Sequence, residues 1–168
     1  MKDIKARGKA RLAQVATRCV KLRNIIDAEE IDLPLKIKLY EIAVCSLLAY
    51  GCETWNLDKD TIRTINGVNS RMLARFTGKS IPQEARPATT SFNLIRRIKQ
   101  RRLRWVGHIL RTDSSRITYQ ALLQQHRMNK EGNLLTDAPP FTSFDDLARQ
   151  AMDRAAWSEH VNSLPYYF

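Results

Sequence analysis

The sequence predicts an all-α protein, an irregular bundle of five to six helices with one long loop near residues 126–142. Apolar residues recur at helical spacing through most of the 168 residues, and no run alternates with the period of two typical of a half-buried strand. Glycine, proline and small polar residues stand at the ends of these stretches, where helices begin and end. We expect two units, a basic helical bundle over residues 1–116 and a C-terminal helical extension over residues 117–168.

The first two helices are predicted over residues 4–26 and 33–50. Asp32 can cap the second helix, with Pro34 in its first turn, and Gly51 is a natural terminator. Because this second helix is apolar on most sides, we expect it to be the buried centre of the fold.

A third helix is predicted from Asp58 or Asp60 to a stop at Gly78. The two aspartates could also suggest a metal site, but acids at the start of a helix are more simply explained by capping and the helix dipole. Near the C-terminus, Ser143 can cap a last helix over residues 144–163, which follows a short helix and the long loop.

The most informative stretch is Leu94–Arg111, a helix that we expect Thr90 or Ser91 to cap. It holds seven basic residues and no acid. On a helical wheel one half is apolar and includes Leu94, Ile95, Ile98, Leu103, Trp105, Val106, Ile109 and Leu110. The other half carries the candidate nucleic-acid-binding residues, which are Arg96, Arg97, Arg101, Arg104, His108 and Arg111. The alternative is a solvated surface helix, but ordinary solvated faces usually mix both signs of charge.

The charge of the chain is concentrated in its middle. Residues 61–120 carry 13 bases and two acids, which equals the whole net charge of +11, and the remainder sums to zero. This distribution favours a localised phosphate-binding face over a generally adhesive protein.

The sequence contains little that indicates catalysis or metal binding. The three cysteines form no CxxC pair and the three histidines lie far apart, so we expect reduced buried thiols, no metal site and no cofactor. Trp55 and Trp105 are more simply core residues than base-stacking platforms. No apolar run approaches the roughly 20 residues that span a bilayer. We therefore expect an intracellular protein without enzyme activity, and the sequence does not distinguish nucleus, cytoplasm and organelle.

Four phrases in order resemble the C-terminal part of reverse transcriptases from non-LTR (LINE-type) retrotransposons. They are Leu48–Trp55 (Leu-Ala-Tyr-Gly-Cys-Glu-Thr-Trp), Asn69–Gly78, Arg101–Arg111 (Arg-Arg-Leu-Arg-Trp-Val-Gly-His-Ile-Leu-Arg) and Asp153–Trp157 (Asp-Arg-Ala-Ala-Trp). Leu33–Tyr40 also fits, and the similarity covers roughly residues 10–162.

The resemblance implies a helical region that corresponds to the thumb and the segment after it, where the thumb holds the template–primer duplex. The family's aromatic-Ala-Asp-Asp signature, its other palm acids and its endonuclease are absent from this sequence, and polymerisation requires metal ions held by those acids. The resemblance therefore implies a duplex-binding origin without polymerase chemistry. The positions that match its basic motif are Arg101, Arg102, Arg104, Trp105, Gly107, His108 and Arg111.

Two of these matching positions are unusual within a helix. Arg102 lies in the apolar arc, where we expect it to be paired or to extend its charged end to solvent. Gly107 costs about 1 kcal/mol relative to alanine in mid-helix. Either close approach of a backbone or phosphate, or a tolerated accident, would account for it.

The favoured hypothesis is a helical module that binds the backbone of a template–primer-like duplex or a structured RNA. The alternative is a structural accessory subunit of a large ribonucleoprotein or organellar complex, whose basic helix contacts RNA, an acidic partner or lipid headgroups. A third possibility is a retroelement remnant that folds and, lacking its palm, covers apolar surface by self-association or with a protein partner.

Overall fold

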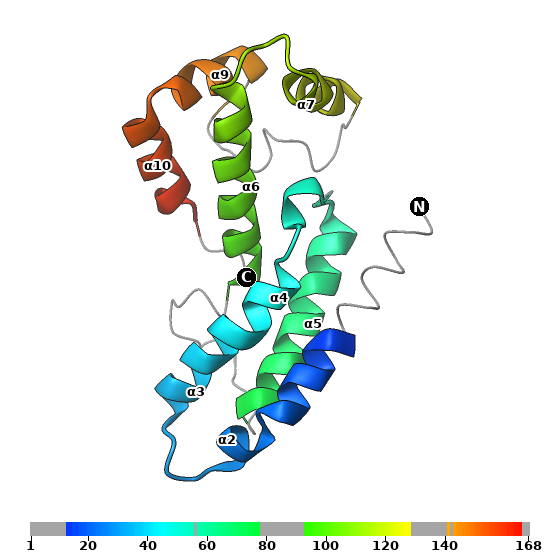
Figure 1. The fold of residues 1–168 in the computed structure, drawn as a ribbon, viewed down its shortest axis with the longest axis vertical. Helices are drawn as coiled ribbons and strands as arrows, with labels where there is room; N and C mark the ends of the chain where they lie inside the picture. The colour runs from blue at the N-terminus through cyan, green and yellow to red at the C-terminus, as the bar shows by residue number, and fades with distance from the viewer. Residues whose placement is uncertain (1–12, 56, 78–92, 129–140, 142, 166–168) are drawn as a thin grey trace. The chain divides into compact units, whose positions relative to one another are not determined.

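The computed structural model describes residues 13–55, 57–77, 93–128, 141 and 143–165 (Figure 1). Every regular element among these residues is helical, which confirms the predicted all-α class. The elements after a helix over residues 13–21 are α2 (Arg23–Asp27), α3 (Leu33–Tyr40), the π-helical turn η1 (Glu41–Cys45), α4 (Ser46–Leu48), the 3-10 turn η2 (Cys52–Thr54), α5 (Lys59–Thr77), α6 (Leu94–Leu110), α7 (Ile117–Met128), α9 (Phe144–Met152) and α10 (Arg154–Ser163).

The predicted N-terminal helix over residues 4–26 is divided at Leu22, and its first residues lie outside the described part of the chain. The amide of Leu22 donates to Arg18 O and Cys19 O, and the carbonyl of Leu22 accepts from Ile25 and Ile26. The single-helix prediction is wrong here because a local turn replaces the continuous helical ladder.

The segment predicted as a helix over residues 33–50 is helical through Leu48, with η1 inserted between α3 and α4. Asp32 caps α3 by accepting from the amide of Leu35 at 3.0 Å. Gly51 adopts the left-handed conformation at φ 63°, which suits a residue without Cβ and lets the chain turn out of the helix. This segment is less buried than expected, since Ile42 and Tyr50 are 65% and 70% exposed.

Asp58 caps the N-terminus of α5, because its carboxylate accepts from the amide of Thr61 at 2.7 Å. This contact confirms the capping interpretation and lowers the pKa of Asp58. The helix ends at Thr77. The predicted stop at Gly78 and the predicted caps Thr90 and Ser91 of α6 lie outside the described residues.

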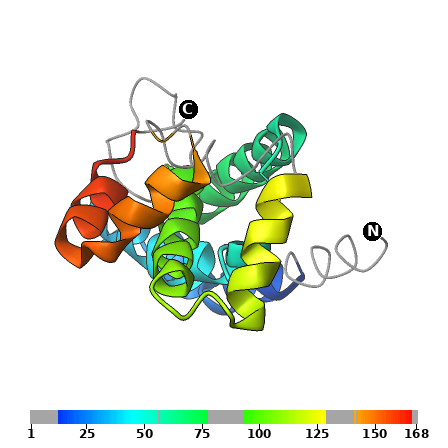
Figure 2. The same cartoon turned by 90° about the horizontal axis from the view of Figure 1, so that it is seen from above.

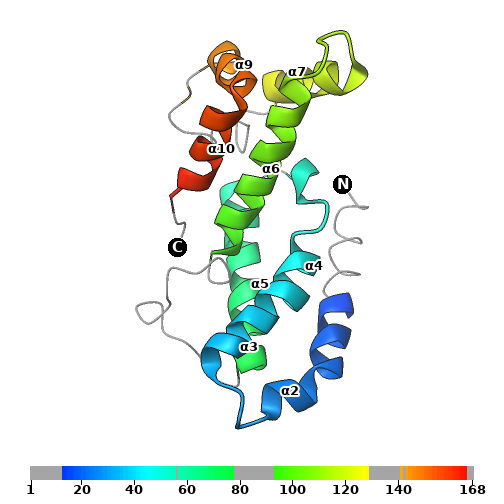
Figure 3. The same ribbon diagram turned by 60° about the vertical axis from the view of Figure 1, so that its left-hand side comes forward.

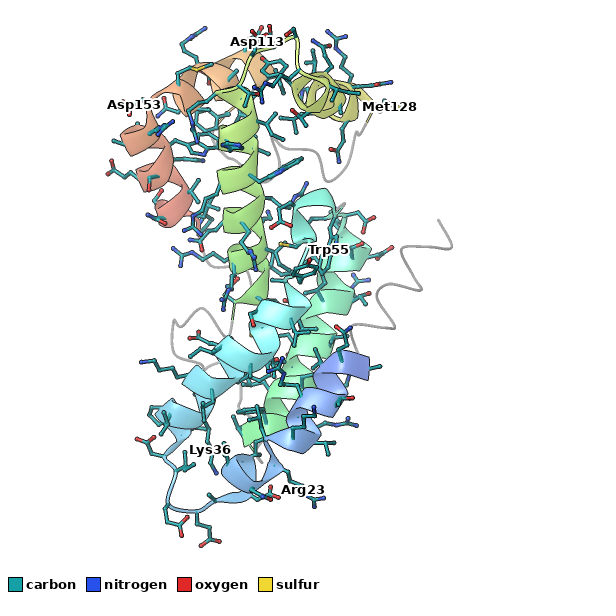
Figure 4. All side chains as sticks on the ribbon, viewed as in Figure 1. Arg23, Lys36, Trp55, Asp113, Met128 and Asp153 are labelled. Atoms are coloured by element: carbon teal, nitrogen blue, oxygen red, sulfur yellow. The ribbon has the colours of Figure 1, made fainter. Side chains whose placement is uncertain are left out.

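The last predicted helix, over residues 144–163, is two helices in the structure. Ser143 caps α9 as expected, accepting from the amide of Asp146 at 3.1 Å. Asp153 then leaves the helical conformation and caps α10, accepting from the amides of Ala155 and Ala156 (Figure 4). A second capping residue therefore divides the periodic stretch. The preceding loop region begins later than predicted because α7 extends to Met128, and residues 129–140 lie outside the description.

The chain forms two compact units. Unit 1 comprises residues 1–50 and 65–94, and unit 2 comprises residues 51–64 and 95–168. This division places almost all of α6 with the C-terminal helices, whereas the sequence suggested a boundary near residue 116.

The core of unit 1 gathers around Tyr40 of α3 and the second half of α5. The Tyr40 hydroxyl donates to Asn69 Oδ1 at 2.7 Å, and the Tyr40 ring meets Phe76 edge-on with centroids 5.5 Å apart. Burial raises the pKa of Tyr40, so the hydroxyl keeps its proton.

The core of unit 2 is built around α6. In this unit α10 runs alongside α6 (Figures 1 and 3), while α9 and α7 flank it on opposite sides when viewed from above (Figure 2). The buried residues of this core are Leu103, Val106, Ile109, Leu110, Leu122, Phe144, Leu147, Ala151, Trp157, Val161 and Leu164.

We expect Tyr40→Phe to lower the free energy of unfolding by about 1–2 kcal/mol, because it removes a buried hydrogen bond while keeping the ring. Urea unfolding followed by far-UV circular dichroism measures this change. Tyr119→Phe is the matched control, since the structure shows the Tyr119 ring against Phe144 at 6.3 Å and gives its hydroxyl no bond to a described residue. Equal stability losses in both variants would contradict the assigned role of the Tyr40 hydroxyl.

Candidate nucleic-acid interface

Helix α6 is buried on more of its circumference than the sequence suggested. The apolar half packs into the core as predicted, and Trp105 lies half-buried against it. Lys99, Gln100, Arg102 and Gly107 are buried as well. The half predicted to be open and cationic is therefore partly covered: residues of α9 and α10 and the C-cap Leu164 bind Arg111, Arg96 and Arg104, and Glu53 of η2 lies beside Arg101.

Arg96 binds the C-terminal end of α10. Its Nε donates to Leu164 O at 2.7 Å and its Nη2 to Asn162 O at 2.5 Å. Gln100 adds a bond from Nε2 to Val161 O at 3.2 Å. The last carbonyls of a helix lack intrahelical partners and carry its negative dipole end, so a guanidinium there supplies both donors and charge.

Arg111 has the corresponding position at the end of α9. Its Nη1 donates to Ala151 O, in the last turn of that helix, at 2.7 Å. Partial burial lowers the pKa of Arg111, and the positive charge of Arg154 lowers it further. Arg96 and Arg111 thus hold the two C-terminal helices onto α6.

Gly107 allows α10 to approach α6. A Cβ added at this position would lie 2.2 Å from Trp157 Nε1, well inside any contact distance that real Cβ atoms show. The same indole nitrogen donates to Leu103 O of α6 at 3.1 Å. Close approach therefore accounts for Gly107, but the approaching group is an indole ring of the same chain and not the backbone or phosphate that the sequence suggested.

Three of the predicted residues form what we call the α6 cationic face: Arg101, Arg104 and His108. Their spacing of i, i+3 and i+7 places them on one side of the helix. Arg104 and His108 are exposed, and Arg104 uses only Nη2 for a 3.0 Å bond to Asn162 Oδ1. Arg101 is 37% exposed and lies 3.7 Å from Glu53 Oε1.

The remaining two arginines are less accessible. Arg97, one turn before Arg101, is half-buried and has an interaction within the chain. Arg102 is only 2% exposed and is also engaged, so it does not extend to solvent. Its charge and that of Arg101 act on the nearby Cys52 thiol.

Burial and nearby charges set the state of the cysteine thiols among the described residues. Burial, with Glu53 adding to it, raises the pKa of Cys52 to about 11, which leaves a protonated thiol and a poor nucleophile. Cys19, Cys45 and Cys52 are all free thiols. The described side chains contain no group of three His, Cys, Asp or Glu residues able to hold a metal ion. Asp60, part of the considered aspartate pair, lies 3.4 Å from Arg63 instead.

Sequence reasoning did not identify Glu53, Asn162 or Trp157 as neighbours of the basic helix. Each lies about 50 residues or more from its α6 partner along the chain, and helical periodicity carries no information on such pairs. Gly107 was a signal for such a neighbour, because its cost in mid-helix had close approach as one of two explanations.

Comparison with protein-family models, with curated proteins and with solved structures finds no match to this chain. Within the described ranges, no helix has the length and apolar character needed to cross a membrane.

We expect Gly107→Ala to destabilise the protein, because overpacking against a rigid, hydrogen-bonded indole costs about 1–3 kcal/mol and outweighs the gain in helix propensity of about 1 kcal/mol. Gly67→Ala is the matched control: Gly67 lies in α5, and a Cβ added there meets nothing within 4 Å. It should stabilise the protein by up to about 1 kcal/mol. Chemical denaturation of both variants provides the comparison, and similar shifts of the same sign would refute the close approach.

His160 should make stability depend on pH. It lies 4.8 Å from Phe141 and 5.8 Å from Trp157 between ring centroids, and desolvation lowers its pKa below 6.5. The folded state then binds fewer protons than the unfolded state, so this contribution is fully present above about pH 6.5 and is lost as pH falls through the lowered pKa. Denaturant midpoints from pH 7.5 downward should fall for wild type and fall less for His160→Phe. Identical pH profiles would contradict this assignment.

Proposed function

We propose that this chain is a helical module that binds the sugar–phosphate backbone of nucleic acid through the α6 cationic face, without polymerase chemistry of its own. The observation that carries the proposal is the position of Arg101, Arg104 and His108 on one side of a helix that contains no acid. Phosphates along a nucleic-acid strand are bound by such fixed rows of cationic and hydrogen-bonding side chains.

The internal contacts of this face leave it able to bind phosphate. A guanidinium has five N–H donors, and the bond from Arg104 to Asn162 occupies one of them. The 3.7 Å pair between Arg101 and Glu53 is partly exposed, and such pairs contribute about 0–1 kcal/mol, so a phosphate can replace the carboxylate at small cost.

Arg96 and Arg111 have a different part in the proposal. Releasing them would free the last carbonyls of α9 and α10, and separating these helices from α6 would expose core residues such as Leu147 and Val161. We therefore assign both arginines to helix capping and propose that they position the face without contacting nucleic acid. Arg97 would lie at the edge of the contact.

The resemblance of the sequence to the thumb region of LINE-type reverse transcriptases supports this proposal, because the thumb of that family holds the template–primer duplex. Glu53 of the first phrase pairs with Arg101 of the third, and Gly107 of the third packs against Trp157 of the fourth. These contacts bring residues of the matched phrases together within unit 2. The aspartates required for polymerisation are not in the sequence.

A second candidate is an accessory subunit of a larger complex, and one observation favours it. Leu35 and Ile42, two helical turns apart, are 47% and 65% exposed, and Leu39 between them is half-buried. A row of exposed apolar side chains is typical of a protein-binding surface. Purification at endogenous level distinguishes the two functions: a fixed stoichiometry that survives nuclease treatment favours the subunit, and nuclease-sensitive association favours the backbone-binding module.

We expect the double variant Arg101→Gln/Arg104→Gln to weaken the salt dependence of binding to a DNA duplex. Each lost phosphate contact lowers the slope of log K against log salt by about 0.9, so the slope should become flatter by about 1.8. Fluorescence anisotropy with a labelled duplex of random sequence, from 50 to 200 mM salt, measures the slope.

The matched control is Arg116→Gln/Arg127→Gln, which removes the same charge from two exposed positions of the same unit at the two ends of α7. Its slope should stay close to that of wild type. Equal slopes for wild type and the α6 variant, with both proteins folded, would exclude the α6 cationic face as the contact.

A further inference from the structure

Unit 1 carries a second group of exposed bases, on a surface outside α6. Arg18 and Lys21 lie in the helix over residues 13–21, and Arg71 and Arg75 lie in the second half of α5. All four side chains are exposed. We call them the unit 1 basic cluster.

The packing of the two helices explains why these side chains face solvent. In α5, Asn69, Leu73 and Phe76 occupy the inner side around Tyr40, so Arg71 lies on the opposite side of the helix. In the N-terminal helix, Val15 is fully buried and marks the inner side. Arg18 and Lys21 are three residues apart, and Arg71 and Arg75 are four residues apart. The two bases of each pair therefore lie on a common stretch of helix surface.

The two helices lie next to each other at this point. Figures 1 and 3 both show residues 13–21 alongside the second half of α5. The positive charge of Arg75 acts on the Cys19 thiol, opposing the larger effect of burial on its pKa. The bases of both helices therefore belong to one region of unit 1.

The bases of this cluster have no ion-pair partner among the described residues. Neither residues 13–26 nor residues 61–77 contain an acid. By contrast, Arg23, another exposed base of unit 1, pairs with Asp27 at 3.1 Å. Within the described part of the chain, the four bases of the cluster have no ion pair of this kind.

Helix-dipole stabilisation is the simpler explanation, since these bases lie toward the C-terminal ends of their helices. Such a contribution is about 0.3–1 kcal/mol and falls off within the last turn. It accounts for Arg75 and Lys21, but like charges four residues apart, as in Arg71 and Arg75, oppose helix stability by about 0.2–0.5 kcal/mol. The two contributions are of similar size, so they leave the excess of bases close to neutral for folding alone, and this excess becomes favourable once a polyanion is present.

We propose that the unit 1 basic cluster is a second binding surface for the phosphodiester backbone of nucleic acid. The proposal rests on the proposed function, because the ligand is the same and the surface is different. Four exposed side chains with cationic ends and no acid among them match a row of phosphates, and they imply contact without base specificity.

The test compares Arg71→Gln/Arg75→Gln with the control Arg23→Gln/Lys38→Gln, which removes two exposed bases elsewhere in the same unit. Binding to the labelled random-sequence DNA duplex is followed by anisotropy across the salt series, and circular dichroism verifies folding. The cluster variant should flatten the slope by about 1.8, while the control should leave it unchanged. Arg18→Gln/Lys21→Gln, on the neighbouring helix, should reproduce the effect.

The outcomes separate this inference from the proposed function. A flatter slope for the α6 variant with an unchanged slope for both cluster variants overturns the second surface and keeps the first. The reverse pattern keeps the cluster and overturns the α6 face. Absence of duplex binding by wild type overturns both, and binding of the cluster to phosphatidylserine vesicles in place of the duplex overturns it in favour of a lipid surface.

Discussion

The contact between Trp157 and Gly107 is the constraint on which the arrangement of unit 2 depends. The indole occupies the space that any Cβ at position 107 would fill, and its N–H bonds to Leu103 O in the same helix. An indole seated this closely brings α10 against α6, and Val161 and Leu164 then complete the core. The propensity cost of glycine in mid-helix is about 1 kcal/mol, which is small beside the burial of a tryptophan side chain.

With α10 packed against α6, the arginines of α6 fall into two groups according to their partners and their exposure. Arg96 donates to a carbonyl at the C-terminal end of α10, and Arg111 donates to a carbonyl in the last turn of α9. Both arginines therefore cap the C-terminal ends of these helices. Arg104 and His108 are exposed, and Arg101 on the same side of the helix is 37% exposed beside Glu53. One basic stretch can therefore stabilise the fold and still present a cationic surface. A count of charges along the sequence does not distinguish these two roles.

The features that the sequence predicted correctly are local. Asp32, Asp58 and Ser143 cap helices three residues from the amides they bind, and Gly51 ends a helix through its own backbone conformation. The features that the sequence did not predict either join segments that are distant along the chain or interrupt a helical apolar pattern. Asp153 interrupts an apolar pattern that continues on both sides of it, and the partners of the α6 arginines lie 40 to 68 residues away along the chain. Amphipathic periodicity identifies a buried face but does not say what covers the other one.

The seating of Trp157 on Gly107 is tested most directly by NMR of the wild-type chain. The account predicts nuclear Overhauser effects between the indole Nε1 proton of Trp157 and the Hα protons of Gly107. It also predicts slow solvent exchange of that indole proton, because it is buried and bonded to Leu103 O. A rapidly exchanging indole proton with no cross-peak to Gly107 would contradict the close approach, and with it the division of the α6 arginines into capping and exposed groups.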